Sequence, residues 1–535
     1  MTVVAQVNPA GAVGPSGPGG SRGLRSVLGA LAGLLAAAAG LGGGELVAAF
    51  VGPSSSPVVA VGNASIALTP EWLKRFAITT FGERDKLALV VGTLVVLALY
   101  ALLVGLVSLR SRRLGAAGIA LFGLLGAVAA GTRPAGRPVD GLPSLVGAAV
   151  GIAVLLVLID ALAAPAEERA TDEASVPAMD RRRFVLAGGV VLGAAVLAGG
   201  GGRLLQRRFA VAGERSRLVL PPPSSPAAVV PAGADLAPRV PGLTPLFTRN
   251  ADFYRVDTAI VVPQVAPDTY RLTMTGMFDS PRAYSLADLY GRSDLIERDV
   301  TLTCVSNEVG GTLAGSARWL GVPLAAVLRE NGVQSRSSQL VCRSVDGMTI
   351  GTPTRAALDV EDAMLAIGMN GEPLPVEHGF PVRMVVPGLY GYVSACKWLT
   401  RIEASTFEAF DAYWVQRLWA QQGPIKIESR IDTPAGDSTF APGRRPVAGV
   451  AWAQTRGISR VEVRIDDGPW TTAQLAPSLG DDLWRQWVLP VDFRPGNHRI
   501  SARATSGHGE LQTERVADPF PDGASGWHTV DVTVR

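Results

Sequence analysis

Three short stretches in the middle of the 535-residue chain gather residue types that can do chemistry. The first is residues 301–311 (TLTCVSNEVGG), where Cys304 follows a run typical of a β-strand and precedes Ser, Asn and a glycine pair. A thiolate at a strand end, beside backbone N–H groups freed by a glycine-rich turn, can be a nucleophile or a soft metal ligand. A buried free cysteine without a chemical role would have the same local composition.

The other two stretches supply cations and backbone donors. Residues 369–383 (MNGEPLPVEHGFPVR) are rich in turn residues and place His378 and Arg383 five positions apart, just before an apolar run. Arg can bind a phosphate through two parallel hydrogen bonds and His can add a ring N–H, although both residue types are also common on ordinary surfaces. Residues 387–399 (PGLYGYVSACKWL) add glycines, Lys397 and further backbone donors, which could complete an anion cradle.

Together and in this order, the three stretches resemble the molybdopterin-dependent oxidoreductases of the sulfite oxidase superfamily, here in a membrane-anchored form of bacterial type. The resemblance rests on Cys304-Val-Ser-Asn307, on Met-Asn-Gly-Glu-Pro-Leu-Pro with His378-Gly-Phe-Pro-Val-Arg383, and on Lys397-Trp398. It covers over half the chain, from about Phe247 to the C-terminus. The family couples an α+β pterin domain to an immunoglobulin-like dimerisation domain, so the resemblance implies both domains and a possible homodimer.

The resemblance also implies roles for the matched residues. Cys304 would be the thiolate ligand of molybdenum, a soft ligand suited to this metal, with the molybdopterin dithiolene and oxo or water ligands in the other positions. Arg249 and Tyr413 would join it as catalytic residues. The residues implied to hold the cofactor are Asn250, Tyr254, Asn307, Asp346, His378, Arg383, Ala395, Cys396 and Lys397. For Asp346, an ordinary turn aspartate is the alternative.

Two departures from the sulfite oxidase pattern concern the substrate. Sulfite oxidases follow Arg-Asn with a histidine, where this chain has Ala251, and the match of Tyr413 crosses a segment of different length. A sulfite site needs several cations around the oxyanion, for which Arg249 and Arg318 are the candidates.

The chain has no residues placed to hold a haem in the membrane part. All four histidines lie beyond residue 370, so no pair of apolar helices can supply two axial imidazoles, and there is no Cys-x-x-Cys-His motif. No haem is therefore expected, and electrons must pass to or from a separate partner such as a cytochrome or a membrane quinone system.

Composition indicates a membrane protein. Only 18% of the residues are charged and the mean hydropathy is +0.27, against about 25% charged residues in soluble proteins. A net charge of +3 without a basic block argues against a nucleic-acid surface, and three cysteines cannot form a disulfide framework. A span needs roughly 20 apolar residues, with about 17 as the lower limit. Five apolar stretches meet this requirement: 24–51, 87–109, 114–131, 142–164 and 184–202. Residues 1–210 are thus predicted to form a bundle of about five spans, rich in the Gly and Ala that favour close packing.

The distribution of arginines predicts the orientation. Arg22, Arg25, the cluster at 110–113, Arg169 and the run at 181–183 fall in alternate loops, which the positive-inside rule places in the cytoplasm. The N-terminus is then cytoplasmic, and the chain beyond about residue 205 is extracytoplasmic. Residues 179–186 (MDRRRFVL) also resemble a twin-arginine export signal, although arginines that only obey the positive-inside rule would look the same.

Three regions follow the bundle. Residues 211–245 form a Pro-rich linker, which is expected to be extended and semi-rigid. Residues 246–427 alternate β-rich and helical runs, as in an α+β domain, the predicted molybdopterin domain. In residues 428–535, strand-like runs separated by turn signals recur every 8–14 residues and predict an immunoglobulin-like β-sandwich.

These features favour a membrane-anchored molybdenum oxidoreductase that exchanges an oxygen atom with a small oxyanion or sulfoxide. A reductase of sulfoxides, such as methionine sulfoxide in proteins, is a second reading. A third is a non-catalytic, membrane-tethered binding module whose β-sandwich recognises a partner.

Overall fold

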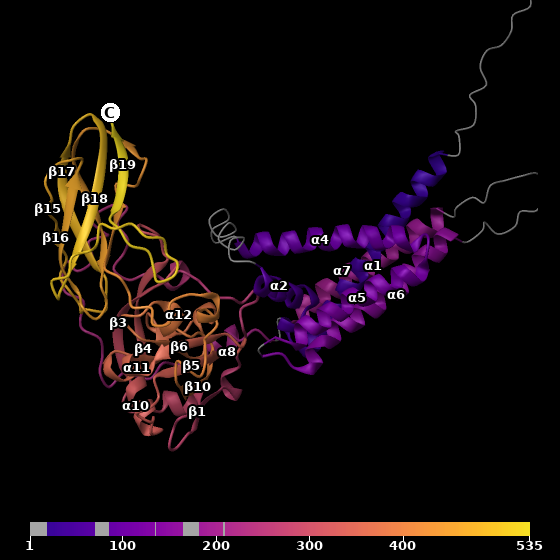
Figure 1. The fold of residues 1–535 in the computed structure, drawn as a ribbon, viewed down its shortest axis with the longest axis horizontal. Helices are drawn as coiled ribbons and strands as arrows, with labels where there is room; N and C mark the ends of the chain where they lie inside the picture. The colour runs from indigo at the N-terminus through magenta and orange to yellow at the C-terminus, as the bar shows by residue number, and fades with distance from the viewer. Residues whose placement is uncertain (1–18, 70–84, 134, 164–180, 207–208) are drawn as a thin grey trace, which may run out of the picture. The chain divides into compact units, whose positions relative to one another are not determined.

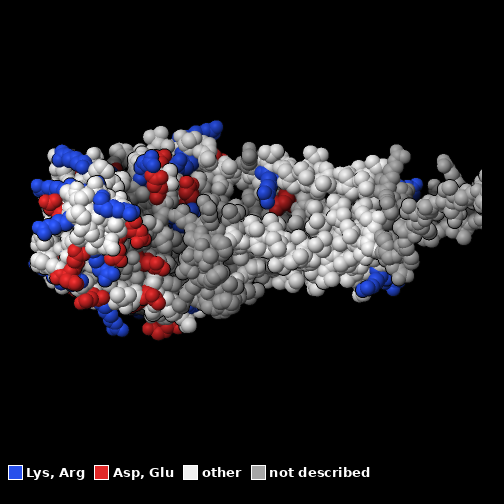
Figure 2. Space-filling view, turned by 90° about the horizontal axis from the view of Figure 1, so that it is seen from above, with Lys and Arg blue, Asp and Glu red and all other residues white. Residues whose placement is uncertain are grey.

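The computed structural model describes residues 19–69, 85–133, 135–163, 181–206 and 209–535. The chain divides into two compact units, Met1–Phe209 and Ala210–Arg535, drawn in Figure 1. On the face drawn in Figure 2, the helical unit shows few charged side chains, whereas Lys and Arg mix with Asp and Glu on the second unit.

The first unit is helical. Its helices are α1 (Gly19–Val51), α2 (Pro57–Leu68), α4 (Asp85–Ser108), α5 (Arg112–Gly131), α6 (Leu142–Ala163) and α7 (Arg181–Gln206). All but α2 contain a stretch long and apolar enough to cross a membrane, which confirms the five predicted helices. In lipid the backbone must satisfy its own hydrogen bonds, and a helix does so within one segment. Helix α2 was not predicted, because its 12 residues are too few for a span.

Glycines set the spacing between helices in this unit. A Cβ added to Gly33 of α1 would overlap the carbonyl oxygen of Ala101 in α4, and one added to Gly105 of α4 would overlap that of Gly29. Gly40 of α1 and Gly147 of α6 approach each other in the same way. The backbones therefore pack directly against each other, as small residues allow in membranes.

Several charged side chains in this unit have polar partners. Glu45 accepts hydrogen bonds from Ser56 at 2.5 Å and from Gln206 at 3.1 Å, and Arg112 pairs with Asp160. Asp140 pairs with Arg133 and Arg137 at 2.9 and 3.1 Å. Arg169, Met179 and Asp180, on which the orientation and export predictions partly rest, lie outside the described residues.

Replacing Gly33 with Leu should separate α1 from α4 and destabilise the helical unit by about 1–3 kcal/mol, because the added atoms meet backbone that cannot move aside. Gly193→Leu in α7 is the matched control, since a Cβ there has nothing within 4 Å. Thermal unfolding of the full chain in detergent measures both, and equal midpoints would contradict the packing described.

The second unit begins with a segment tied to both of its domains. Residues 211–245 contain the short helix α8 (Ala212–Arg215) and no long helix or strand. Ser224 donates to the carbonyl oxygen of Leu295 at 2.8 Å, and Leu236 N–H donates to the side chain of Gln486 at 2.6 Å. Val240 and Leu243 pack against Ala448. The extended segment thus packs against both domains of the second unit.

The α+β domain contains two sheets. The first has the order β2-β1-β10-β5-β6 and the second the order β3-β4-β7-β8, with β9 paired to β7. The strands are β1 (Arg271–Gly276), β2 (Ala283–Ser285), β3 (Ile296–Thr303), β4 (Ala314–Pro323), β5 (Gln339–Ser344), β6 (Thr349–Pro353), β7 (Met364–Met369), β8 (Glu372–Pro373), β9 (Arg383–Val385) and β10 (Leu399–Ser405). The helices are α9 (Leu286–Tyr290), α10 (Leu324–Glu330), α11 (Thr354–Asp359) and α12 (Gly391–Ser394).

The C-terminal domain is a β-sandwich. A sheet of order β11-β13-β17-β16 faces a second of order β12-β19-β18-β14-β15, and Val447 and Trp487 from the first share a core with Val461 and Ala502 from the second. The strands are β11 (Glu428–Thr433), β12 (Thr439–Phe440), β13 (Gly443–Trp452), β14 (Ile458–Ile465), β15 (Thr471–Thr472), β16 (Gln474–Leu475), β17 (Arg485–Phe493), β18 (Gly496–Ser506) and β19 (His528–Val534). The predicted fold class, a helical region followed by a β-rich domain and a β-sandwich, is confirmed.

Strand β3, which leads to Cys304, is hydrogen-bonded to loops of the sandwich. Thr301 donates its N–H to Asp482 at 2.9 Å, accepts from Gln454 at its carbonyl oxygen at 2.8 Å, and accepts from Trp484 N–H at its hydroxyl at 2.8 Å. The indole of Trp484 also donates to Leu246 at 2.8 Å. The sandwich therefore holds the strand on which Cys304 is mounted.

His528 lies at the same junction and should make the fold sensitive to acid. Its Nδ1 accepts the N–H of Ile431 at 2.9 Å, and burial, with Arg430 nearby and partly opposed by Asp432, lowers its pKa from 6.5 to about 4. The unfolded chain binds this proton first, so stability falls as the pH drops from about 6.5 towards 4, by up to about 3 kcal/mol.

In His528→Gln, whose amide oxygen can still accept that N–H, the loss of stability on acidification should be smaller. Unfolding in urea at pH 7 and pH 4.5 measures this, with exposed His508→Gln as the control. An unchanged pH dependence in His528→Gln would contradict the assignment.

Candidate active site

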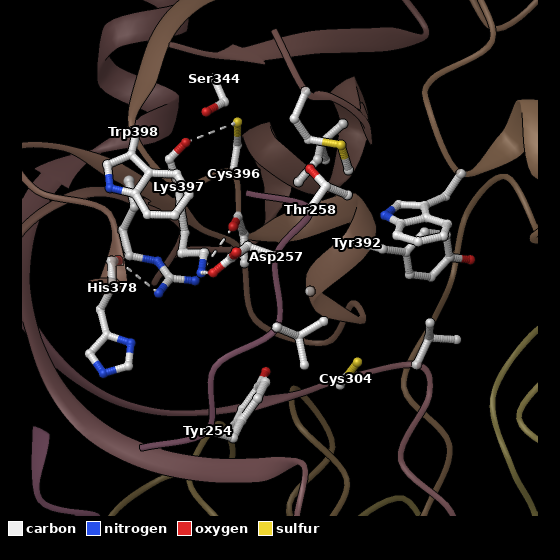
Figure 3. Close-up of a pocket in the computed structure, with 18 of the residues that line it drawn as sticks. Tyr254, Asp257, Thr258, Cys304, Ser344, His378, Tyr392, Cys396, Lys397 and Trp398 are labelled. Atoms are coloured by element: carbon white, nitrogen blue, oxygen red, sulfur yellow. Dashed lines mark hydrogen bonds and ion pairs between the residues drawn. The ribbon is translucent and has the colours of Figure 1, made fainter. Parts of the chain in front are cut away.

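The three stretches that carry the candidate site residues, 301–311, 369–383 and 387–399, all contribute to one pocket of the α+β domain (Figure 3). The pocket has a volume of about 910 Å³ including its open mouth. The predicted site residues that line it are Tyr254, Cys304, Asp346, His378, Arg383, Ala395, Cys396 and Lys397.

Cys304 sits where β3 ends and a loop returns to β4. Its N–H donates to Leu313 at 2.9 Å, and its carbonyl oxygen accepts from Asn307 N–H at 3.1 Å. Cys304 as a whole is 8% exposed. Burial raises its pKa, an effect partly opposed by hydrogen bonds from Ser306. The loop therefore presents one nearly enclosed thiol to the pocket.

Asn307 holds this loop from behind and does not line the pocket. Its side-chain oxygen accepts the N–H of Leu313 at 2.8 Å, and its amide donates to Glu428 of β11 at 3.4 Å. Burial raises the pKa of Glu428 to about 8. Asn307 thus positions the Cys304 loop and links it to the sandwich.

Arg383 of β9 supplies a buried cation with spare hydrogen-bonding capacity. It donates to the carbonyl oxygens of His378 at 3.1 Å and Ala395 at 3.4 Å, and its guanidinium lies 5.1 Å from the centre of the Trp319 ring. Its Nε is buried and has no partner. Burial lowers its pKa to about 10, so it remains charged at neutral pH. A buried charged donor without a partner fits an anionic ligand such as the cofactor phosphate.

His378 is neutral, and its ring is held by a hydrogen bond to the backbone of Asn250. Its Nε2 lies 2.9 Å from the carbonyl oxygen of Asn250, which can only accept, so Nε2 carries the proton. Burial lowers its pKa to about 4, and its ring meets Phe253 edge to face at 5.5 Å. The ring N–H that the sequence analysis assigned to a phosphate is used by Asn250 in this structure.

Lys397 is paired with a carboxylate that the sequence analysis missed. Its ammonium donates to Asp257 at 2.6 Å and to the carbonyl oxygen of Glu377 at 3.3 Å, above the ring of Trp398. Burial lowers the lysine pKa to about 8. Asp257 also pairs with Arg255 at 2.8 Å. No motif marks Asp257, because its partner is 140 residues away.

Asp346 and Asn250 have structural bonds in addition to their predicted roles. Asp346 lines the pocket and accepts the N–H of Met348 at 3.1 Å, as a turn aspartate does. Asn250 bonds to Asn370 at 2.8 Å and to Glu372 at 2.5 Å, and so fixes the loop under His378 without lining the pocket.

Arg249, Arg318 and Tyr413 also lie outside the set of lining residues. The side chain of Arg249 is 83% exposed and pairs with Asp252, while Arg318 pairs with Asp299. The guanidinium carbon of Arg417 lies 3.5 Å from the centre of the Tyr413 ring. Their catalytic roles, and that of Arg318 in binding an oxyanion, stay predictions.

A group of aromatic residues in the pocket was also missed. Tyr392, Trp414 and Trp419, here termed the aromatic wall, line the pocket. The ring centres of Tyr392 and Trp419 are 6.1 Å apart, and those of Trp414 and Trp419 are 6.3 Å apart. The only available signal was the position of Trp414 beside Tyr413.

This fold and pocket define a molybdopterin-binding oxidoreductase domain, and residues 259–414 match the family model described as "Oxidoreductase molybdopterin binding domain". The chain is 30% identical to human mitochondrial sulfite oxidase over 342 residues, covering 54% of this chain and 60% of that protein. It is 30% identical to sulfite oxidase from Gallus gallus, covering 51% of this chain and 69% of that protein.

The chain belongs to the sulfite oxidase family. It spans about 60% of the length of the mammalian relatives it matches. The sulfane dehydrogenase SoxCD from Paracoccus pantotrophus is similar in structure, with a TM-score of 0.49 and 22% identity over 54% of this chain and 82% of that chain.

Asn307→Leu should destabilise the second unit by about 1–3 kcal/mol, because the N–H of Leu313 loses its acceptor. Hydrogen exchange at Leu313 should also become faster. Glu308→Ala, an exposed neighbour in the same loop, is the control. Unchanged exchange at Leu313 in Asn307→Leu would show that Asn307 does not hold the loop.

Proposed function

We propose that the chain is a membrane-anchored molybdenum oxidoreductase whose catalytic domain is extracytoplasmic and transfers an oxygen atom to or from a small substrate. The observation that carries this proposal is the meeting of two groups in one pocket. Cys304 offers a nearly enclosed thiol, and Arg383 offers a buried cation with an unpaired N–H.

The residues present fit the molybdenum–molybdopterin cofactor. Cys304 would bind the metal through its thiolate, and Arg383 with Lys397 would hold the terminal phosphate. Around the pterin would lie His378, Asp346, Tyr254 and the backbone of Ala395 and Cys396, with Asn250 and Asn307 holding their loops. When bound, the cofactor supplies two-electron redox chemistry coupled to exchange of an oxygen atom.

Tyr254 is placed to give a hydrogen bond near Cys304. Tyr254 and Cys304 line the same pocket, and Cys304 is among the groups that act electrostatically on the Tyr254 hydroxyl. Burial is the main cause that raises the pKa of Tyr254, with Cys304 adding to it. The phenol therefore keeps its proton and can donate to a substrate oxygen.

The helical unit and the charge distribution of the loops support the remaining parts of the proposal. The five helices would anchor the protein, with the N-terminus in the cytoplasm by the positive-inside rule. Electrons would pass to or from a separate cytochrome or quinone system. The sandwich would provide a homodimer contact, as the family resemblance implies.

Cys304→Ser should abolish turnover and change the visible absorption, because the sulfur–metal bond is lost, while Arg383 still retains the pterin. Cys342→Ala, whose sulfur contacts Met384 in the core, is the control. The measurements are molybdenum and pterin content, the spectrum, and turnover with artificial electron donors and acceptors. Absence of molybdenum from the wild-type protein, or full turnover by Cys304→Ser, would overturn the proposal.

A further inference from the structure

The helical unit contains a cavity of its own, lined by residues of α1, α2, α4, α5 and α6. Its volume is about 690 Å³ including its open side. The space exists because glycines and alanines make up about half of the lining, so few side chains fill it. Helix α2, which is too short to cross a membrane, supplies Pro57 and Val61. The short helix therefore forms part of the cavity wall.

The lining of this cavity is apolar except at two side chains. Among the described residues, no charged residue lines it, and only Tyr100 and Ser144 bring a polar side-chain atom. The Tyr100 hydroxyl already uses its proton, which it donates to the carbonyl oxygen of Gly118 at 2.9 Å. Ligand sites between helices commonly combine apolar walls with a few polar groups that fix orientation. A ligand of this cavity must therefore be uncharged.

Ser144, in the first turn of α6, is the polar group that lacks a partner. It is 4% exposed, and its hydroxyl makes no hydrogen bond. The hydroxyl is directed towards α5, because a Cβ built on Gly126 would lie 2.8 Å from it, and both residues line the cavity. A buried hydroxyl without a partner is costly, and the interior of a membrane offers no water to replace one. A ligand that accepts a hydrogen bond would remove this cost.

Two aromatic rings line the next part of the cavity. Phe122 stands one helical turn before Gly126 on α5, and its ring centre is 5.8 Å from that of Tyr100. The Tyr100 hydroxyl reaches Gly118, which is just over two turns, or about 12 Å, from Gly126 along α5. The cavity therefore follows α5, with a free hydrogen-bond donor at one end and two rings beyond it. A flat ring with an acceptor at its edge matches this order.

We propose that the helical unit binds a membrane-soluble quinone, with a carbonyl oxygen accepting the Ser144 hydroxyl and the ring against Phe122 and Tyr100. A quinone is uncharged and flat, it has carbonyl acceptors on its ring, and its hydrocarbon chain suits the apolar remainder of the cavity. A lipid acyl chain has no acceptor and would leave Ser144 unpaired. The inference goes beyond the proposed function, because it gives the bundle a ligand of its own.

The position of Ser144 along the bundle supports this ligand. Ser144 is near the start of α6 and Gly126 is near the end of α5, so the donor lies towards one end of both helices. The ring is the polar end of a quinone and belongs near a membrane surface, with the chain towards the bilayer centre. In the proposed orientation, this surface is the extracytoplasmic one, on which we also propose that the catalytic domain lies.

Photolabelling of the purified full chain in lipid nanodiscs free of quinone tests the site. The probe is a decyl benzoquinone with an azide on its ring, and peptide mass spectrometry locates the label after irradiation. We expect the label on α5 or α6 beside Ser144. Excess decylubiquinone should prevent the labelling, whereas decylbenzene should not, because it has a ring and a chain but no carbonyl.

Two variants test the residues that line the cavity, with native mass spectrometry of the chain in detergent to measure Kd for decylubiquinone. Ser144→Ala should raise Kd about fivefold, because one hydrogen bond is lost. Ala37→Phe should abolish binding, because the larger side chain fills the space. Ser108→Ala is the matched control: this buried serine donates to the carbonyl oxygen of Val104 at 2.7 Å and does not line the cavity, so Kd should not change.

The outcomes separate this inference from the proposed function. Label spread over the lipid-facing sides of the helices, displacement by decylbenzene, or equal Kd values in Ser144→Ala and Ser108→Ala would overturn the quinone site. A protein that holds molybdenum and binds no quinone would also overturn it, and would leave the molybdenum enzyme standing. A protein that binds the quinone beside Ser144 and holds no molybdenum would support this inference and overturn the proposed function.

Discussion

A buried guanidinium whose Nε has no partner is the main electrostatic constraint on the pocket of the second unit. Removing a charge from water costs several kcal/mol, and Arg383 recovers part of this through two carbonyl oxygens and the face of Trp319. Its Nε remains without a protein partner. Asp257, a carboxylate that lines the same pocket, is paired with Lys397 and Arg255 instead. An anion that accepted this N–H would supply the missing partner.

The parts of the site that could be predicted from the sequence are those whose chemistry is local. Cys304, His378, Arg383 and Lys397 stand in short motifs, and the structure brings all four to one pocket. The hydropathy of the five long helices is local in the same sense. A motif of a few residues is enough to predict each of these site residues, and a stretch of about 20 residues is enough to predict each long apolar helix.

The parts that could not be predicted depend on contacts between distant segments. Asp257 meets Lys397 across 140 positions, and Tyr392 meets Trp419 only after the chain has turned back on itself. Arg249 shows a different difficulty. A motif predicts which residue type stands at a position, but it does not predict where the side chain points, and the side chain of Arg249 extends into solvent.

Strand β3 is part of the α+β domain but is hydrogen-bonded to the sandwich. Its residue Thr301 bonds to Asp482, Gln454 and Trp484 of the sandwich, and the strand leads directly to Cys304. A chain that lost its last hundred or so residues would lose the clamp on its reactive sulfur. An unrelated C-terminal domain could replace the sandwich only if its loops offered Thr301 the same three hydrogen bonds.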